Sequence, residues 1–344
     1  MENSISRILI ETTVRRTLKN IRADPKRSIR NLVDMAMQFS QGRFQGEFFA
    51  SAHTMLQNDS SAYYALVQDV ANHVETEHLV RFGMNVGYNS CTWGARQIRR
   101  NEKELHFNIP WIVLFELDHP VFSDRLNLYD RAIAEGEHLG IYSWILSVRS
   151  PDDPLHCLEL VQAHPDSAFF LLCPSEAVTP DLIKHISPLC NLMLVVRFDD
   201  AAAAACAQLR QAQLPYSVFF PYAQQEADWI IRGDLFAITQ NLHPVFTVLV
   251  PRRDCCAQTR RLVYAAATEA RNKQYYATIP WEICEDIRKL DEIISDDSCC
   301  VFFDREGKIL LPEEKQLSCG GNLFRDGLVS VIRRAYPKTA AVRP

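Results

Sequence analysis

The sequence has 344 residues, of which 47% are hydrophobic and 23% charged, and its net charge is -5. This composition is typical of a globular protein and excludes disordered and fibrous classes, and the acidic balance argues against a nucleic-acid or anionic-membrane surface. No apolar run is long enough to span a bilayer, and residues 1–20 form a charged amphipathic pattern unlike a signal peptide, so we expect a cytoplasmic protein.

Residues 1–105 predict a helical N-terminal domain. Apolar residues recur at helical spacing in five segments, 4–20, 26–39, 44–56, 63–77 and 79–104. The last segment contains Gly83, Gly87 and Gly94, which leave its continuity open.

From Pro110 onward, short apolar strands alternate with helices. The predicted strands are 111–117, 142–148, 168–173, 191–198, 216–222, 244–250 and 275–281. The predicted helices between them are 128–139, 154–163, 179–186, 201–212, 227–240 and 256–272. Nearly continuous apolar strands are typical of a parallel sheet covered on both faces by crossover helices. The pattern therefore predicts an α/β fold, with a partial or full (β/α) TIM-like barrel over residues 106–282.

Residues 283–344 predict a small C-terminal tail. Segments 300–303 and 308–311 form a β-hairpin with Gly307 in its turn, and 323–335 form a short helix.

Two common ligand classes lack their motifs. The sequence has no G-x-G-x-x-G and no P-loop, which argues against a glycine-rich phosphate site. Its cysteines number 11, an odd count without any C-x2-C or C-x3-C spacing, so short metal-binding knuckles are absent. We expect most of them to be reduced thiols in the core.

The segment 99–114, RRNEKELHFNIPWIVL, resembles the start of the barrel in radical S-adenosylmethionine enzymes, especially those with a helical N-terminal extension and a SPASM-like tail. The similarity covers roughly residues 21–327, including 127–128 and 136–140 in the first barrel helix, 214–216 before the fifth strand and the hairpin 304–311. The resemblance implies a barrel built to hold a [4Fe–4S] cluster that chelates S-adenosylmethionine.

The residues that this chemistry requires are missing. The family places C-x3-C-x2-C after the first strand, but 116–128 reads ELDHPVFSDRLNL, and no cysteine lies between Cys91 and Cys157. The family's Gly-Gly-Glu-Pro motif after the second strand corresponds to VRSP at 148–151, and its auxiliary-cluster cysteine would fall near Pro312. The resemblance therefore implies a degenerate member with no iron–sulfur cluster and no cofactor.

Charged residues follow the strands where barrel chemistry takes place. Arg149, Arg197 and Arg252 could converge on an anion, because guanidinium groups suit carboxylate and phosphate. The alternative is an internal ion-pair network with Glu116, Asp118, Asp199 and Asp254 that fills the vacated cavity. We expect this second arrangement, with Phe115, Phe122, Val148 and Arg149 collapsed inward, the arginines paired to Glu116 or Asp199, and no cofactor-sized pocket between the first two strands. On that alternative, Arg149→Ala costs about 1–3 kcal/mol. The candidate ligand-binding residues are Glu116, Asp118, His119, Arg149, Arg197, Asp199 and Arg252.

The tail offers a weaker metal candidate made of Cys284, Cys299, Cys300 and Cys319. Their irregular gaps favour buried thiols, since neighbouring residues in a strand point to opposite faces.

The sequence assigns no catalytic residue. We expect a catalytically inactive pseudoenzyme that acts as a scaffold, substrate carrier or partner subunit. Its partner would be a catalytic radical S-adenosylmethionine paralogue, the substrate of that paralogue, or a second copy of the chain, and we expect neither nucleic acid nor a membrane as a partner. The alternative is a repurposed barrel that binds or converts a small anionic ligand at the C-terminal ends of its strands.

Overall fold

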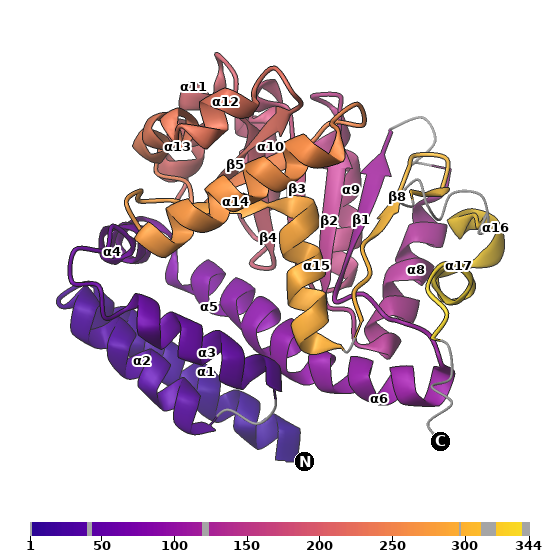
Figure 1. Ribbon diagram of the computed structural model, residues 1–344, viewed down its shortest axis with the longest axis horizontal. Coiled ribbons are helices and arrows are strands. Elements are labelled where there is room, and N and C mark those ends of the chain that lie inside the picture. Colours follow the sequence, from indigo (N-terminus) through magenta and orange to yellow (C-terminus); the bar gives the residue numbers. More distant parts are fainter. Residues whose placement is uncertain (1, 40–42, 119–123, 296, 311–320, 339–344) are drawn as a thin grey trace.

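The computed structural model describes residues 2–39, 43–118, 124–295, 297–310 and 321–338. One sheet of nine strands organises it, in the order β7-β6-β5-β4-β3-β2-β1-β8-β9 (Figure 1). The strands are β1 (Ile112–Leu117), β2 (Ser143–Val148), β3 (Ala168–Cys173), β4 (Leu192–Arg197), β5 (Tyr216–Tyr222), β6 (Phe246–Pro251), β7 (Ile279–Glu282), β8 (Val301–Phe303) and β9 (Ile309–Leu310).

Strands β1 to β7 are parallel and pair in sequence order. Helices connect them: α8 (Leu126–Leu139), α9 (Asp153–Ala163), α10 (Pro180–Ile186), α11 (Ala202–Gln211), α12 (Ala227–Ile231), α13 (Asp234–Thr239) and α14 (Ala257–Lys273). Within the described residues, β7 pairs with β6 alone, so the sheet is curled without being closed. The predicted α/β fold is confirmed in its partial-barrel form.

The two faces of the sheet carry different helices. On the outer face, Phe115 stacks on Trp144 with ring centroids 5.7 Å apart and meets Tyr129 of α8 edge-on at 5.2 Å. On the opposite face, which we call the inner face, Phe170 of β3 contacts Phe82 at 5.3 Å and Trp281 of β7 at 5.4 Å. The alternation of strand side chains therefore assigns each residue near the strand ends to one face.

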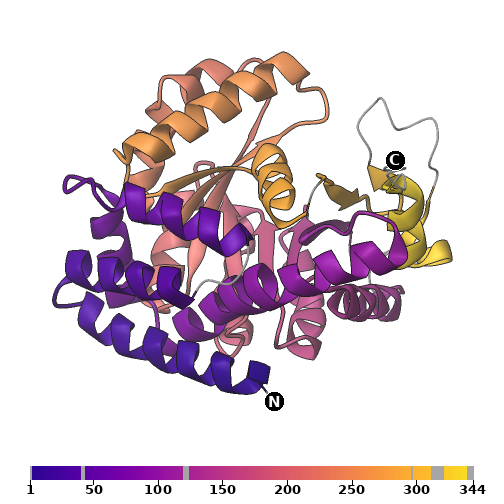
Figure 2. The ribbon, with the colours of Figure 1, turned by 60° about the horizontal axis from the view of Figure 1, so that its bottom comes forward.

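The N-terminal helices lie at the end of the sheet where the parallel strands begin (Figures 1 and 2). They are α1 (Glu2–Ile21), α2 (Pro25–Phe39), α3 (Arg43–Met55), α4 (Tyr63–His73), α5 (Thr76–Met84) and α6 (Ala95–Leu105), with a π-helix at Asn85–Gly94 between the last two. The helical pattern predicted over 79–104, whose continuity the sequence leaves open, is thus one helical run that changes from α to π and back to α. A Cβ on Gly94 would clash with the carbonyl oxygen of Gly140, so this glycine permits the close approach of the π-helix to the barrel.

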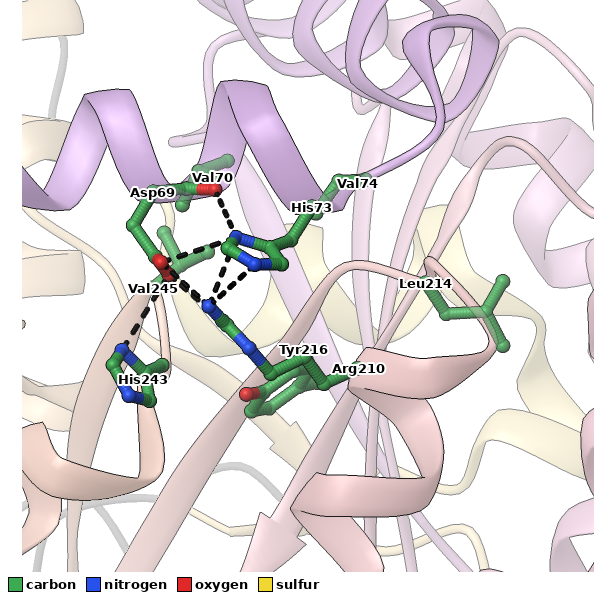
Figure 3. A pocket seen from close by; sticks show the side chains of 9 residues that line it. All are labelled: Asp69, Val70, His73, Val74, Arg210, Leu214, Tyr216, His243 and Val245. Atoms are coloured by element: carbon green, nitrogen blue, oxygen red, sulfur yellow. Dashed lines mark hydrogen bonds and ion pairs between the residues drawn. The ribbon is translucent and has the colours of Figure 1, made fainter.

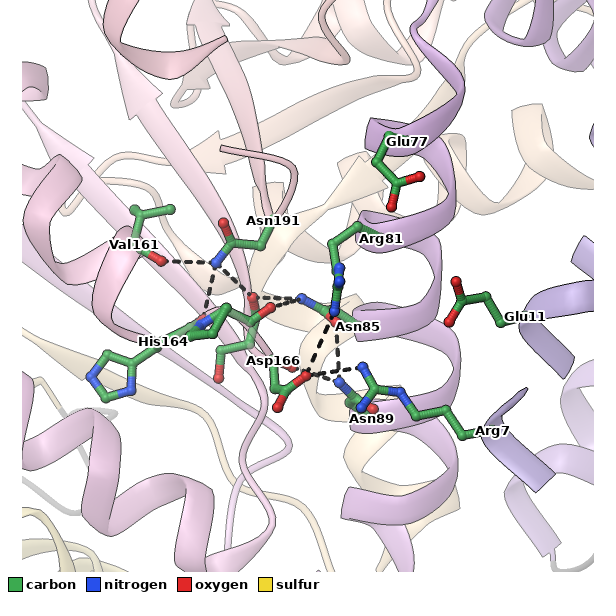
Figure 4. Close-up of polar contacts among 12 residues, drawn as sticks. Arg7, Glu11, Glu77, Arg81, Asn85, Asn89, Val161, His164, Asp166 and Asn191 are labelled. Atoms are coloured by element: carbon green, nitrogen blue, oxygen red, sulfur yellow. Dashed lines mark hydrogen bonds and ion pairs between the residues drawn. The ribbon is translucent and has the colours of Figure 1, made fainter. Parts of the chain in front are cut away.

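Buried amides attach the π-helix to the barrel (Figure 4). Asn85 Nδ2 donates to the carbonyls of Pro165 and Ser167 at 3.0 and 2.9 Å, and Asn89 Nδ2 donates to that of Asp166 at 2.7 Å. Arg7 of α1 adds an ion pair with Asp166 at 2.9 Å. The segment before β3 thus receives contacts from both α1 and the π-helix.

The structure contains a helix that the sequence pattern did not predict, α15 (Ile283–Ile294). The Glu282 side chain caps it by accepting from the Glu285 backbone N–H at 2.7 Å. Trp111 Nε1 donates to the carbonyl of Ile287 at 3.1 Å, which ties the helix to the residue before β1.

The C-terminal tail continues the barrel sheet. Strand β8 pairs in parallel with β1, and β9 pairs antiparallel with β8, which places the predicted hairpin. The predicted final helix is divided at Gly327 (φ +76) into α16 (Leu323–Asp326) and α17 (Leu328–Ala335). The division of the chain into domains at residues 105 and 282 stays a prediction.

None of the helices in the described ranges has the length and apolar character needed to cross a membrane.

Candidate binding site at the barrel mouth

The C-terminal ends of the strands form the barrel mouth, and their inner face carries charged side chains. Glu116 of β1 is half-buried and shares the inner face with the buried Leu114 two residues earlier. Arg149 follows the last residue of β2, and Arg197 is the last residue of β4. Both are exposed.

Glu116 is the centre of the mouth. Its Oε2 atom lies 3.0 Å from Nη2 of Arg253 and 3.7 Å from Nη2 of Arg149. The Glu116 side chain is 23% exposed, whereas those of Arg253 and Arg149 are 68% and 66% exposed. The carboxylate is thus largely covered while both guanidinium groups stay open to solvent.

A second ion pair joins the mouth to the tail hairpin. Arg305 Nη1 donates to Asp118 Oδ2 at 2.9 Å. Sequence reasoning missed Arg305 because it lies in a hairpin turn, where the strand-end rule that selected the other candidates does not apply.

Two predicted site residues point elsewhere. Arg252 forms a two-bond ion pair with Glu226, at 3.0 and 2.9 Å, and takes no part in the Glu116 cluster. Asp199 accepts from the Ser175 hydroxyl at 2.5 Å and from the Ala201 backbone N–H at 3.1 Å, so it stabilises the turn after β4. His119 lies outside the described residues.

Arg197 differs from the other arginines at the mouth. Its side chain is exposed, and within the part of the chain that the structure describes it has no hydrogen-bond or ion-pair partner. The predicted network of arginines and carboxylates is therefore incomplete at β4.

The predicted inward collapse is wrong for the side chains that can be checked. Phe115 and Val148 are buried on the outer face, because they alternate with Glu116 and Arg149 along their strands. Arg149 extends into solvent, and Phe122 lies outside the described residues.

Three of the tail cysteines are described, and all three are buried: Cys284 beside Cys300, and Cys299 near Asp291. The thiols of Cys284 and Cys300 are hydrogen-bonded to each other, and this bond together with burial raises the pKa of Cys284. Cys299 donates its backbone N–H to Asp291 at 2.7 Å, and burial raises the pKa of its thiol. Cys319 lies outside the described residues, and among those described no group of three His, Cys, Asp or Glu side chains is placed to hold a metal ion.

Glu282 has the most unusual carboxyl environment at this end of the barrel. It is the last residue of β7, lies fully buried on the outer face, and accepts from the Tyr222 hydroxyl at 2.8 Å. Burial raises the pKa of Glu282 to about 7, against the opposing effect of the Glu285 N–H and the Tyr222 hydroxyl. The Glu282 carboxyl takes no part in the Glu116 cluster, because it faces the other side of the sheet and caps α15.

A shallow pocket lies at the opposite end of the barrel, between α4 and the start of β5 and β6 (Figure 3). Asp69 accepts two hydrogen bonds from Arg210 at 2.8 and 2.6 Å, and His73 and His243 flank it at 3.1 and 3.6 Å. Burial alone would raise the pKa of Asp69, but Arg210 outweighs it and holds that pKa below its ordinary value. Asp69 and Arg210 neutralise each other here, and their ion pair attaches α4 to α11.

The order of the strands defines an open (β/α) barrel, the fold that radical S-adenosylmethionine enzymes have. The solved structure of SuiB from Streptococcus suis bound to S-adenosylmethionine is similar with a TM-score of 0.50, at 10% identity, over 73% of this chain and 69% of that one. A structure of SuiB alone is similar with a TM-score of 0.49, at 10% identity, over 90% of this chain and 79% of that one. No protein-family model and no curated protein matches the sequence. The similarity confirms the fold that the sequence resemblance implied.

That fold implies an iron–sulfur cluster, and the residues of this chain do not fit one. Cysteine thiolates are the ligands of such clusters, and none occurs between Cys91 and Cys157, the stretch that contains β1 and β2. At the mouth, β1 presents a carboxylate already bound to two arginines. These side chains offer oxygen and guanidinium groups where soft sulfur ligands are required.

Proposed function

We propose that this protein is a radical S-adenosylmethionine enzyme-like barrel that has lost radical chemistry and works as a scaffold, substrate carrier or partner subunit. One observation carries the proposal: the chain has no cysteine from residue 92 to residue 156, so neither β1 nor the following loop can supply the cluster ligands. A barrel without the cluster has no means of holding S-adenosylmethionine through iron. We expect its partner to be a catalytic radical relative, the substrate of that relative, or a second copy of the chain.

The sequence after β2 supports the same proposal. Residues 148–151 read VRSP, and Arg149 extends into the mouth as a charged, exposed side chain. The glycines that would let a backbone approach a cofactor closely are replaced by Val148 and Arg149, both of which carry a Cβ.

The test is anaerobic reconstitution with iron and sulfide, with SuiB treated in parallel as the positive control. We expect no absorbance of a [4Fe–4S] cluster and no 5′-deoxyadenosine from S-adenosylmethionine above a control without protein. Either signal, at a level stoichiometric with the protein, would overturn the proposal.

A second candidate function is binding of a small anionic ligand at the mouth. The observation that favours it is that Arg149 and Arg253 share one carboxylate oxygen of Glu116, while Arg197 has no side-chain partner among the described residues. Exposed guanidinium groups that are only partly paired can bind a carboxylate or phosphate group. Calorimetric titration of the wild-type protein with citrate and with pyrophosphate tests it, and absence of binding by both would exclude it.

A further inference from the structure

Two arginines from distant strands converge on one oxygen atom of Glu116. Arg149 follows β2, next to β1 in the sheet, whereas Arg253 follows β6, at the far side of the mouth. Both guanidinium groups approach Oε2, at 3.7 and 3.0 Å. One carboxylate oxygen of Glu116 is therefore shared by two guanidinium groups.

Arg197 supplies a second positive position on the same face. Its strand, β4, is separated from β2 only by β3, so the strands that carry Arg149 and Arg197 lie about 10 Å apart. The described residues give Arg197 no partner. Among the described residues, the mouth therefore has one carboxylate shared by two arginines and, at Arg197, one arginine without a side-chain partner.

The neighbouring arginines do not share this property. Arg252 is held by two hydrogen bonds to Glu226, and Arg305 is paired with Asp118 at 2.9 Å. Within the described ranges, Arg149, Arg197 and Arg253 are thus the arginines at the mouth that share a carboxylate or have no side-chain partner.

The level beneath these arginines consists of Ser147, Leu172 and Val195, which lie next to each other on the inner face. Ser147 is half-buried, and Leu172 and Val195 are 3% and 0% exposed. Buried side chains beneath the guanidinium groups lower the local dielectric constant and strengthen their attraction to an anion. The exposed guanidinium N–H groups are accessible to such an anion without any unfolding.

We propose that the mouth binds a ligand bearing at least two carboxylate or phosphate groups, and that Glu116 is an internal competitor which occupies Arg149 and Arg253 until the ligand displaces it. This inference rests on the second candidate function, anion binding, and adds to it the ligand class and the competing role of Glu116. Guanidinium groups form paired hydrogen bonds with either oxyanion, so the chemistry common to carboxylate and phosphate defines the ligand. Arg197 binds the second anionic group.

If Glu116 competes with the ligand, its loss should strengthen anion binding, whereas the loss of an arginine should weaken it. Calorimetric titrations at low ionic strength with citrate and with pyrophosphate, and with acetate as the single-charge control, would compare the wild type with Glu116→Gln, Arg197→Gln and Arg253→Gln. We expect Glu116→Gln to bind the multivalent anions about tenfold more tightly, and the two arginine variants to bind them about tenfold more weakly. Acetate should bind far more weakly than either in every variant.

Arg232→Gln is the matched control, because Arg232 is also an arginine paired with one carboxylate, Asp234, and is 66% exposed like Arg149. It should bind both anions as the wild type does. Thermal unfolding of each variant checks that the fold is intact. We expect it to be intact because the substituted arginine side chains are exposed. Which of the two anions binds identifies the oxyanion.

Unchanged or weaker binding in Glu116→Gln would overturn the competing role while leaving anion binding in place. An absence of binding in every variant would overturn both, and neither result would bear on the cluster test. Equal loss in Arg232→Gln would show non-specific attraction and would also overturn the proposal.

Discussion

Arg253 and Glu116 form an ion pair between the two sides of the barrel, at 3.0 Å, although four strands separate β6 from β1 in the sheet. In a flat sheet the two strands would lie about 24 Å apart, at about 4.8 Å for each step. Two side chains cannot bridge that gap. Their contact therefore follows from the curl of the sheet, which brings the ends of β1 and β6 together.

A double-mutant cycle with Arg253→Ala and Glu116→Ala measures the coupling free energy of this ion pair. Because the arginine is 68% exposed, we expect a coupling free energy of about 0.2–1 kcal/mol that decreases with added salt. For the same reason Arg149→Ala should change the free energy of unfolding by less than about 1 kcal/mol, below the 1–3 kcal/mol expected for a buried pair. Urea unfolding checks both, and a coupling above about 2 kcal/mol would show that the pair is desolvated.

Stability should depend on pH through Glu282. The folded state raises the pKa of this carboxyl from 4.5 to about 7, so its contribution is fully present below about pH 4.5 and is lost as pH rises to about 7. Glu282→Gln should remove that loss, which amounts to about 2–4 kcal/mol. Urea unfolding of both proteins between pH 5 and pH 8 measures the difference.

Tyr222→Phe provides the control for Glu282. The Tyr222 hydroxyl donates to Glu282 Oε1 and favours its charged form, so its removal should raise the pKa of Glu282 further and move the loss of stability to higher pH. Parallel pH profiles for the wild type and Glu282→Gln would contradict this account.

Two glycines in helices should respond in opposite directions to alanine. A Cβ on Gly136 of α8 would lie 2.5 Å from Cη2 of Trp144, within the outer-face core, so Gly136→Ala should destabilise the fold by about 1–3 kcal/mol. A Cβ on Gly83 of α5 would meet nothing within 4 Å, so Gly83→Ala should stabilise it by about 0.5–1 kcal/mol. Thermal unfolding distinguishes the two, and equal effects would contradict the packing seen around Trp144.

Asn191 should be a strong contributor to stability. Its buried Nδ2 donates to the carbonyls of Val161, His164 and Ser167 at 2.9, 3.0 and 3.2 Å (Figure 4). Asn191→Ala would leave these buried oxygens with fewer donors and should cost about 2–3 kcal/mol. Asn241→Ala is the matched control, because Asn241 makes one exposed bond to Ala237, and it should cost less than about 0.5 kcal/mol in urea unfolding.

Strands with apolar residues at every position were predictable from the sequence. Strands β3 and β5 have the bounds that the apolar runs predicted, because both faces of each are largely covered and the run ends where burial ends. The strand predicted at 275–281 begins four residues too early, since Tyr275 is 69% exposed and precedes the sheet. Hydrophobicity alone does not separate an exposed aromatic residue from a strand residue.

Helix α15 and the partner of Glu116 could not be predicted in the same way. Helix α15 is rich in acidic residues and begins directly after β7, with the last strand residue, Glu282, as its cap, so no loop separates the two elements in the sequence. Arg252 and Arg253 follow β6 side by side, and only the turn after the strand decides that Arg253 reaches Glu116 while Arg252 binds Glu226. Two adjacent arginines are equivalent in the sequence, so the sequence does not indicate which of them reaches Glu116.

The pairing of β8 with β1 determines when, during synthesis, β1 gains its second neighbouring strand. Strand β1 is synthesised long before β8. The pairing that joins Val113 to Val301 and Phe115 to Phe303 can form only after residue 303 has been made. Until then one backbone edge of β1 has no strand beside it, and unpaired edges of apolar strands are sites of aggregation. A nascent or truncated chain that ends before β8 therefore exposes its first strand, and chaperone protection would be needed at that stage above all others.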